Sequence, residues 1–387
     1  MGALTLTSLI PTIQTAMDTI SREMIGFIPA VSTDSGAERA AIGQTVYSPV
    51  VGAMSAEDLT PAAYAADTPD QTIGNVPVTI SKARSVPFGI TGEETMGLNN
   101  AGTKVGINQQ RIEQAIRTHT NEIEGDLAAL HIASSRAYGT ATGTPFGTAG
   151  VLTDFAQSAK MLDDNGANQA DRHMVLGSTA VARIRGVQST LFQVNTGGSL
   201  ADDLLRRGAL GAVQGFDLHN SAQVKTSTAG SVTATVDNTG YAVGSTTFTT
   251  SAAAVALVAG DIITFAGDTN QYVVKTAVTG SGTDTLVIQE PGLLVAMSAA
   301  TKAITVVAAT TRNMFFQRNA IVLATRAPAM PDEGDAADDV MLVTDPVTGL
   351  VFEFCIYKQK RQVRYECNLA YGVAMVQPRH CGLLIGA

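Results

Sequence analysis

The longest amphipathic pattern in the chain lies in residues 109–138. Apolar residues recur there at steps of three, four and seven, which places them on one face of an α-helix. Glu113 stands four residues before Arg117, the order that favours an ion pair along a helix. We therefore predict a long spine helix over residues 109–138. The alternative is a coiled-coil helix or one long helix of a bundle, and strand-like segments on both sides disfavour it. The predicted core face of this helix consists of Ile112, Ile116, Ile123, Leu127 and Leu130.

Strand patterns precede the spine helix. Residues 45–51 (TVYSPVV) are rich in β-branched residues, and residues 76–88 (VPVTISKARSVPF) begin with alternating apolar and polar positions. Residues 52–75 lie between these strands, and a loop this long inside a compact domain is generally functional. We predict an extended hairpin over residues 45–90 that contacts a neighbouring subunit; a solvated loop is the alternative. Candidate contact residues on the hairpin are Glu57, Asp58, Asp67, Asp70, Lys82 and Arg84.

The N-terminal residues 4–24 carry apolar side chains at helical steps, which predicts a helix with one apolar face. Two interpretations fit this face. It belongs either to an arm that contacts a neighbouring subunit or to an ordinary first helix packed on its own domain.

After the spine helix, helical and strand-like patterns alternate, as is typical of a small mixed α/β domain. We predict helices over residues 152–163, 178–187 and 200–207, and strands over residues 172–176 and 214–220.

The composition changes between residues 225 and 309, where helical periodicity is nearly absent. Short strands rich in Val and Thr alternate there with Gly turns, a pattern typical of a β-barrel or sandwich. We predict an inserted all-β domain over residues 225–310, with Ile263 and Val274 in its core. Because the parent domain must continue across the insert, Val224 and Thr311 are expected to lie close together.

Residues 351–366 (VFEFCIYKQKRQVRYE) predict a long ribbon with a basic cluster at one end. This cluster either touches nucleic acid or pairs with acidic groups across a subunit contact. The chain has a net charge of −9, which favours the second interpretation and disfavours a strongly basic nucleic-acid binder. The contact candidates in this ribbon are Lys358, Lys360, Arg361 and Arg364.

Length and composition narrow the class of protein further. The 387 residues suffice for two or three domains, and aromatic residues make up only 5 %, which disfavours an aromatic-lined ligand pocket. Cys355, Cys367 and Cys381 lack the spacing of a zinc site, so we expect buried thiols in a reducing compartment. The first residues show no secretory signal and no run of about 18 apolar residues occurs, so we expect synthesis in the cytosol and no membrane span.

Motifs that carry chemistry are not found in the sequence. There is no nucleophile elbow, phosphate-binding loop or zinc-protease motif. The acidic run in residues 332–339 lacks the spacing of a calcium loop, so we interpret it as a solvated loop. We predict no catalytic, cofactor-binding or metal-binding residues, and a structural role for the five histidines, His119, His131, His173, His219 and His380.

The order of these segments resembles that of tailed-phage major capsid proteins with the HK97 fold. Residues 207–224 (RGALGAVQGFDLHNSAQV) resemble a segment that such coat proteins carry late in their central domain. Residues 345–350 (DPVTGL) and 370–378 (AYGVAMVQP) resemble their C-terminal end. The β-rich stretch that contains residues 259–267 (AGDIITFAG) is similar to the inserted domain of the phage P22 type of coat protein.

This resemblance implies an α+β fold with a defined division of the chain. The expected parts are an N-terminal arm (1–44), an extended loop (45–90), a peripheral domain with the spine helix (91–150), a central axial domain (151–224 and 311–344), an inserted β domain (225–310) and C-terminal strands that return to the peripheral domain (345–387).

The resemblance also implies a structural, non-enzymatic function. Such subunits form the hexamers and pentamers of an icosahedral procapsid, with a scaffolding protein inside and a portal protein at one vertex. The shell then expands as double-stranded DNA is packaged without sequence-specific binding. The expected location is the virion capsid, assembled in the host bacterial cytoplasm.

Two alternative functions are kept beside this one. The first is an encapsulin-type nanocompartment shell of the same fold, which the β insert disfavours because such a shell needs no inserted domain. The second is a secreted β-rich adhesin or glycan-active enzyme, which the missing signal and the lack of paired catalytic carboxylates disfavour.

Overall fold

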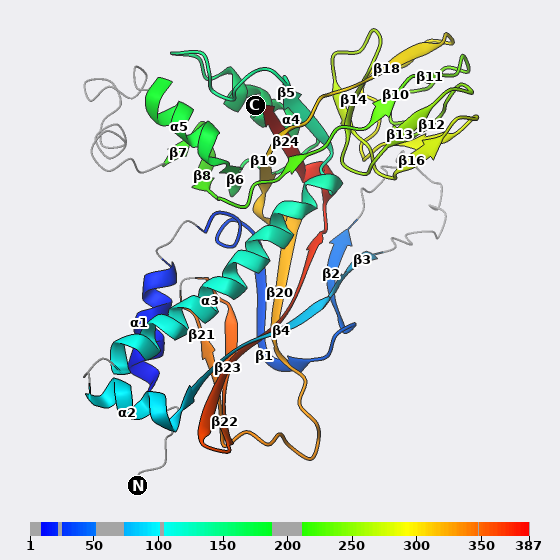
Figure 1. Cartoon of the computed structure of the whole chain (residues 1–387). Helices are drawn as coiled ribbons and strands as arrows, with labels where there is room; N and C mark the ends of the chain where they lie inside the picture. The colour runs from blue at the N-terminus through cyan, green and yellow to red at the C-terminus, as the bar shows by residue number, and fades with distance from the viewer. Residues whose placement is uncertain are drawn as a thin grey trace, which may run out of the picture.

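The computed structural model describes residues 9–21, 25–51, 73–100, 104–187, 211–346 and 348–386. The described part is an elongated α+β molecule built on two sheets, with one long helix that runs along the first sheet toward the second (Figure 1). A group of short strands extends the second sheet on the side away from helices α4 (Thr153–Asp164) and α5 (Ser178–Val187).

The first sheet, here called the peripheral sheet, is organised around the long strand β23. β23 pairs antiparallel with three strands, and the parallel pair β1–β20 and the antiparallel pair β21–β22 complete the sheet. Its strands are β1 (Ser32–Ala40), β4 (Lys82–Thr91), β20 (Ile321–Pro328), β21 (Asp339–Thr344), β22 (Val351–Gln359) and β23 (Gln362–Met375).

Helix α3 (Lys104–Ala129) packs along the peripheral sheet and supplies most of the predicted spine. Ile112, Ile116, Ile123 and Leu127 are at most 3 % exposed and share one core with side chains of β22 and β23. Leu130 is only partly buried and lies in a short 3₁₀ turn, η2 (Leu130–Ala133). The apolar stripe thus faces the sheet, as its periodicity requires.

The predicted C-terminal end of the spine helix is wrong. The helix ends at Ala129, and Arg136–Gly139 form strand β5 instead. β5 pairs with β24 (Cys381–Gly386) on one side and with β15 (Gln271–Val273) on the other. The seven-residue step from Leu130 to Ala137 suggested that the helix continues to Ala137. Pairing with two neighbouring strands instead holds this backbone in an extended conformation.

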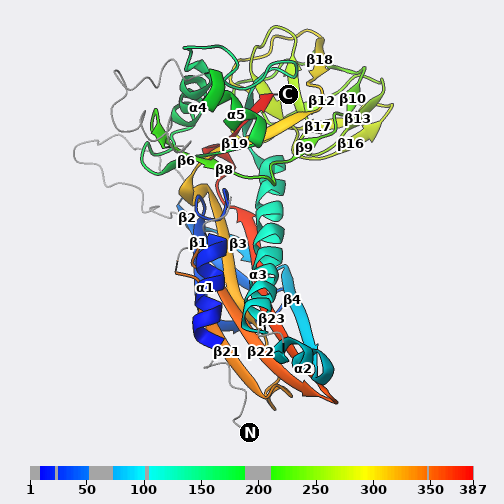
Figure 2. The ribbon, with the colours of Figure 1, turned by 60° about the vertical axis from the view of Figure 1, so that its left-hand side comes forward.

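The first helix, α1 (Ile10–Ser21), lies beside α3 on the same side of the peripheral sheet (Figure 2). Ile13, Ala16 and Met17 are buried in the core that α3 also lines. Within the described residues, the apolar face of α1 packs on its own chain, which agrees with the second interpretation of this helix. The rest of the predicted range 4–24 lies mostly outside the described part, which omits residues 1–8 and 22–24.

The second sheet, here called the central sheet, carries α4 and α5. Phe155, Leu162, Val181 and Ile184 of these helices pack against Met174 and other strand residues. The predicted segments 152–163, 172–176, 178–187 and 214–220 are confirmed within two residues, while 200–207 lies outside the described residues. Besides β5 and β24, this part of the sheet comprises β6 (Arg172–Leu176), β7 (Ala212–Val213), β8 (Phe216–Asn220), β9 (Thr226–Ser227) and β19 (Thr310–Gln317).

The insert has a core of its own but is joined to the central sheet. Ile263 and Val274 are fully buried in a cluster with Phe248, Phe265 and Tyr272. The first and last residues of the insert are adjacent, as predicted, because Thr226 pairs with Thr311. Its strands are β10 (Ser231–Val232), β11 (Thr235–Val236), β12 (Thr247–Thr249), β13 (Val255–Leu257), β14 (Ile262–Phe265), β15, β16 (Val278–Gly280), β17 (Thr285–Val287) and β18 (Lys302–Val306).

The pairing of β15 with β5 makes one 11-stranded sheet from the central sheet and part of the insert. Gln271 faces Ala137 and Tyr272 faces Arg136 across this junction. The insert is therefore not a free-standing unit in the chain, which differs from the separate domain expected from its composition.

Several strand assignments also differ from the prediction. Residues 76–88 form two strands rather than one, because Ile73–Thr79 (β3) pairs with Thr45–Val51 (β2) whereas β4 pairs with β23. Residues 351–366 form a hairpin, with a turn at Lys360 and Arg361 between β22 and β23. Strand β1 and helix α2 (Gly92–Asn100) were not predicted, because their sequences are polar and lack a clear period. Strand β21 was not predicted because it begins at the end of the acidic run that was interpreted as a loop.

The sheets also cross the expected domain boundaries at three places. β1 belongs to the peripheral sheet although it lies within residues 1–44, and β20 and β21 belong there although they lie within 311–344. β24 pairs with β5 and β19 in the central sheet, so only the first part of residues 345–387 stays with the peripheral sheet. Strand pairing between distant segments, which sequence patterns do not encode, decides these boundaries.

Candidate functional site

The β2–β3 hairpin lies beside β20 of the peripheral sheet (Figure 1). Its seven residue pairs run from Thr45 opposite Thr79 to Val51 opposite Ile73, and within the described residues β2 and β3 pair only with each other. At its base, Val78 is fully buried against Ala324 and Ala370 of the peripheral sheet. An isolated two-stranded ribbon is marginally stable in water, so the part beyond this base requires additional contacts.

Tyr47 marks the exposed face of this hairpin. Its side chain is 64 % exposed although it lies at the centre of β2, opposite Pro77. Exposed aromatic side chains on a strand with a free edge are typical of binding surfaces. The predicted contact residues Glu57, Asp58, Asp67 and Asp70 belong to residues 52–72, which lie outside the described part.

Lys82 and Arg84 contact acidic groups of their own chain. Lys82 Nζ lies 2.7 Å from Asp126 Oδ2 and 3.1 Å from Glu122 Oε1, and Arg84 Nε lies 2.9 Å from the same Glu122 oxygen. The hydrogen bond to Asp126 raises the pKa of Lys82. These ion pairs attach the start of β4 to α3, so the two cations are already engaged in the single subunit, where they had been expected to face a neighbour.

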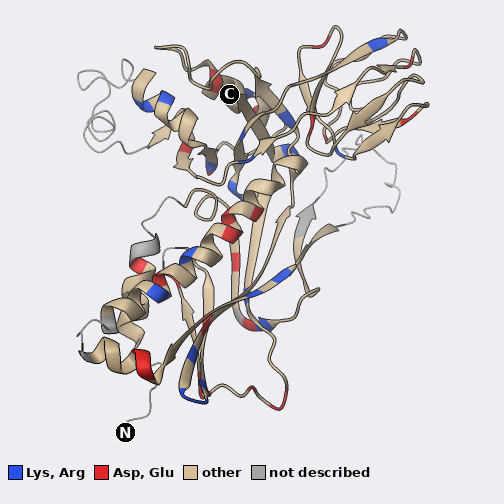
Figure 3. Cartoon of the chain, in the orientation of Figure 1, with Lys and Arg blue, Asp and Glu red and all other residues tan. Residues whose placement is uncertain are grey.

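The basic cluster of the C-terminal ribbon surrounds the turn between β22 and β23 (Figure 3). Lys358 Nζ pairs with Asp338 Oδ2 at 2.5 Å, and Arg364 Nε pairs with Glu366 Oε1 at 2.7 Å. Lys360 and Arg361 form the turn itself, are exposed, and make no ion pair among the described residues. The turn therefore presents two unpaired cations at one end of the peripheral sheet.

Glu124 connects three parts of the molecule, a role that the sequence analysis missed. Its carboxylate accepts hydrogen bonds from the backbone N–H groups of Phe27 and Ile28 and from the hydroxyl of Ser221. The side chain is 2 % exposed, and burial raises its pKa. The available signal was its position three residues before Leu127, which places an acidic residue at the border of the apolar stripe.

The side chains of four of the five histidines make polar contacts within the chain. His119 Nε2 contacts the carbonyl of Cys367, and His131 Nδ1 contacts the carbonyl of Ala128. His173 and His219 instead contact each other, with 3.1 Å between Nδ1 and Nε2, because β6 and β8 are parallel neighbours. Burial, followed by the neighbouring His173, lowers the pKa of His219 to about 4. This pair was not predicted, because the two histidines are 46 positions apart in the sequence.

The described residues were also examined for metal-binding groups and for membrane-spanning helices. No group of three or more His, Cys, Asp or Glu side chains that could hold a metal ion occurs among those residues. None of the helices in the described part of the chain is long and apolar enough to cross a membrane. The three cysteines are buried free thiols, and burial raises the pKa of Cys355 and Cys381 to about 12.

The chain matches no family model and no curated protein, but it is similar to solved particle structures. The capsid of the cyanophage P-SCSP1u has a TM-score of 0.46 and 12 % identity, over 93 % of this chain and 88 % of that chain. The structure from Mycobacterium phage Che8 has a TM-score of 0.44 and 11 % sequence identity, over 95 % of this chain and 90 % of that chain. The virus-like particle from Pyrococcus furiosus has a TM-score of 0.44 and 8 % sequence identity, over 97 % of this chain and 98 % of that chain.

Proposed function

We propose that this chain is the subunit of a closed protein shell, namely the major capsid protein of a tailed phage with the HK97 fold. The observation that carries the proposal is the β2–β3 hairpin, a two-stranded ribbon with an exposed Tyr47 at its centre and no further strand partner in the described residues. Such a ribbon gains stability when a neighbouring copy covers it, because the neighbour buries its apolar face and pairs its free backbone groups.

The form of the molecule supports the same proposal. A single layer of helices, α1 and α3, backs the peripheral sheet, and the two sheets are joined in an elongated molecule rather than one compact core (Figure 2). The edge strand β21 of the peripheral sheet leaves Leu342 exposed. A thin subunit with exposed edges at its ends is suited to tiling a curved surface beside copies of itself.

The proposal also includes the partners with which the subunit assembles. We infer hexamers and pentamers of an icosahedral shell, a scaffolding protein and a portal protein during assembly, and expansion from a procapsid to a mature capsid around double-stranded DNA. The net charge of −9 suits a protein that encloses DNA without sequence-specific binding. Under this proposal, the acidic residues Glu57, Asp58, Asp67 and Asp70 of the segment 52–72, together with Lys360 and Arg361 at the β22–β23 turn, are candidate contacts between copies.

Assembly is the direct test. The full chain is expressed alone and together with candidate phage scaffolding proteins, and the products are analysed by light scattering and electron microscopy. We expect closed shells tens of nanometres across. A monodisperse monomer under all salt and scaffold conditions would overturn the proposal. Shells that form without a scaffold and enclose an enzyme would assign the chain to the nanocompartment class instead.

A further inference from the structure

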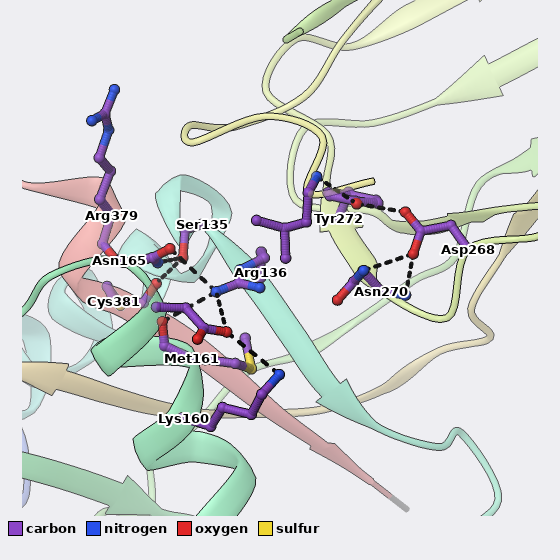
Figure 4. Close-up of polar contacts among 12 residues, drawn as sticks. Ser135, Arg136, Lys160, Met161, Asn165, Asp268, Asn270, Tyr272, Arg379 and Cys381 are labelled. Carbon is purple, nitrogen blue, oxygen red and sulfur yellow. Dashed lines mark hydrogen bonds and ion pairs between the residues drawn. The ribbon is translucent and has the colours of Figure 1, made fainter. Parts of the chain in front are cut away.

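Many cations of this chain are paired with acids of the same chain. Where the insert meets the central sheet, for example, Lys160 Nζ and Arg136 Nη2 lie 3.5 Å and 3.9 Å from the same carboxylate oxygen of Asp164 (Figure 4). The turn between β22 and β23 differs, because its central residues Lys360 and Arg361 are exposed and make no ion pair among the described residues. These two residues are here called the cationic turn.

Arg361 has an unusual backbone conformation for a residue with a long side chain. Its φ is 58°, in the left-handed region that glycine and asparagine adopt most readily. Its carbonyl accepts a hydrogen bond from the N–H of Gly92 at 3.0 Å, and Gln359 pairs with Gln362 across the turn. The backbone of the cationic turn is therefore fixed, while its two side chains extend into solvent. Strained backbone of this kind is concentrated at functional sites.

A second turn, of opposite charge, lies at the same end of the peripheral sheet (Figure 3). The N–H of Gly334 donates to the carbonyl of Pro331 at 3.0 Å, so Asp332 and Glu333 are the central residues of a β-turn. Both acids are exposed and make no ion pair within the part of the chain that the structure describes. Asp332 and Glu333 are here called the acidic turn.

The loop that carries the acidic turn is attached to β22 by other residues. Asp335 accepts a hydrogen bond from the hydroxyl of Tyr357, and Asp338 Oδ2 pairs with Lys358 Nζ at 2.5 Å. These contacts place the acidic turn beside the strand that leads to the cationic turn. They do not join the two turns, which form no ion pair with each other.

The other acids near the cationic turn leave it unpaired among the described residues. Glu366 Oε1 pairs with Arg364 Nε at 2.7 Å, and Glu94 Oε2 accepts a hydrogen bond from the N–H of Thr91 at 3.0 Å. Glu93, at the start of α2, is exposed and makes no ion pair. Each subunit thus presents unpaired positive and negative groups side by side at one end.

We propose that the cationic turn of one subunit binds the acidic turn of a neighbouring copy of the same chain. This inference rests on the proposed shell function and names the partner of Lys360 and Arg361 within it. Because every copy carries both turns, every copy donates cations to one contact and accepts them in another. A nucleic acid would pair with the cations only, and the acids at the same end would repel its phosphates. A second copy pairs with both turns.

Charge reversal in the full chain tests this contact. One double variant combines Lys360→Glu with Arg361→Glu, and the other combines Asp332→Lys with Glu333→Lys. Each should lower the yield of closed shells, measured by sedimentation, about tenfold, because attraction between the turns becomes repulsion. The chain with all four substitutions should recover to within about twofold of the wild type, since the charges have exchanged places and attract again.

Two further variants separate this contact from general effects. Arg183→Glu with Arg185→Glu, at exposed positions of α5, changes the net charge by the same amount and should assemble like the wild type. Arg361→Gly removes the charge but suits the backbone, because glycine adopts a positive φ without strain. The Tm of the dissociated Arg361→Gly subunit should therefore stay equal or rise, while its yield of closed shells falls.

The results distinguish failure of this contact from failure of the shell function. Wild-type yields from the two charge-reversed double variants, or no recovery when all four substitutions are combined, would overturn the contact and leave the shell function standing. A loss of yield confined to the variants of the cationic turn would indicate another partner, such as the packaged nucleic acid, and would also overturn it. A wild-type chain that forms no shells under any salt or scaffold condition would overturn the shell function and this contact with it.

Discussion

Glu124 Oε1 accepts a hydrogen bond from the backbone N–H of Ile28 at 2.8 Å, across 96 positions of the sequence. The same carboxylate accepts from Phe27 N and from Ser221 Oγ, so one side chain of α3 fixes the segment before β1 and the segment after β8. Because these donors are buried, no water replaces the carboxylate if it is removed. Glu124 thus sets how the peripheral and central sheets sit on the spine helix.

The first prediction concerns this carboxylate. Glu124→Ala should lower the free energy of unfolding by about 3 kcal/mol or more, because several buried donors lose their acceptor. Glu124→Gln should cost less, since its amide oxygen still accepts hydrogen bonds and, with the pKa of Glu124 raised by burial, the neutral side chain avoids a desolvation cost. Urea unfolding of the dissociated subunit measures both. Equal losses in the two variants would contradict this ordering.

The second prediction concerns the spine. Ile116→Asp should cost on the order of 5 kcal/mol, comparable with the whole stability of a domain, because Ile116 is buried against the peripheral sheet. Soluble expression should collapse. Gln114→Asp, on the exposed side of the same helix, is the control and should change stability by about 0.5 kcal/mol or less. Thermal melting by circular dichroism that matches the wild type for Ile116→Asp would show that this face is not buried.

The third prediction concerns pH. The pKa of His219 is lowered from 6.5 to about 4, so the unfolded chain takes up a proton first as the pH falls. Stability from this group is therefore present above pH 6.5 and is lost as the pH falls toward about 4. The charged groups that act on His219 are Asp217 and Arg318, besides His173. His219→Asn should flatten the dependence of Tm on pH in this window, and an unchanged slope would exclude the pair as its origin.

The fourth prediction concerns the hairpin. Tyr47→Asp should leave the stability of the isolated subunit within about 0.5 kcal/mol, because the ring is mostly exposed, while the yield of closed shells falls. Val295→Asp, at an exposed apolar position of the insert, serves as the control for a general loss of solubility. Subunit unfolding and particle yield by sedimentation separate the two effects. Wild-type particle yield from Tyr47→Asp would remove this residue from the subunit contact.

The fifth prediction concerns the insert. We expect residues 225–309 to fold when excised, because Phe248, Phe265 and their neighbours form a core without help from the rest of the chain. The free energy of unfolding of the excised segment should be small, because β15 loses its partner strand β5. Dispersed amide resonances and a cooperative melt would support this expectation. A random-coil spectrum would mean that the insert needs the central sheet in order to fold.

The local elements of this protein follow from its sequence because their signals are local. The apolar steps that include Ile112 and Ile116 placed the helix and its buried face, and the alternation around Val78 placed a strand whose inner residue is buried. Ser178–Val187 and Arg172–Leu176 were predicted at their observed bounds. In each case the side-chain period of one helix or strand is sufficient, and no distant partner is needed.

Only the tertiary structure decided which distant segments meet. Arg136–Gly139 became a strand because β15 and β24 flank it, and Lys82 turned toward α3 because β4 pairs with β23 beside that helix. The pairing of His173 with His219 and the role of Glu124 each depend on residues at least 46 positions apart. Strand order and the packing of helices on sheets bring such residues together, and the side-chain period of a single segment carries no information about either.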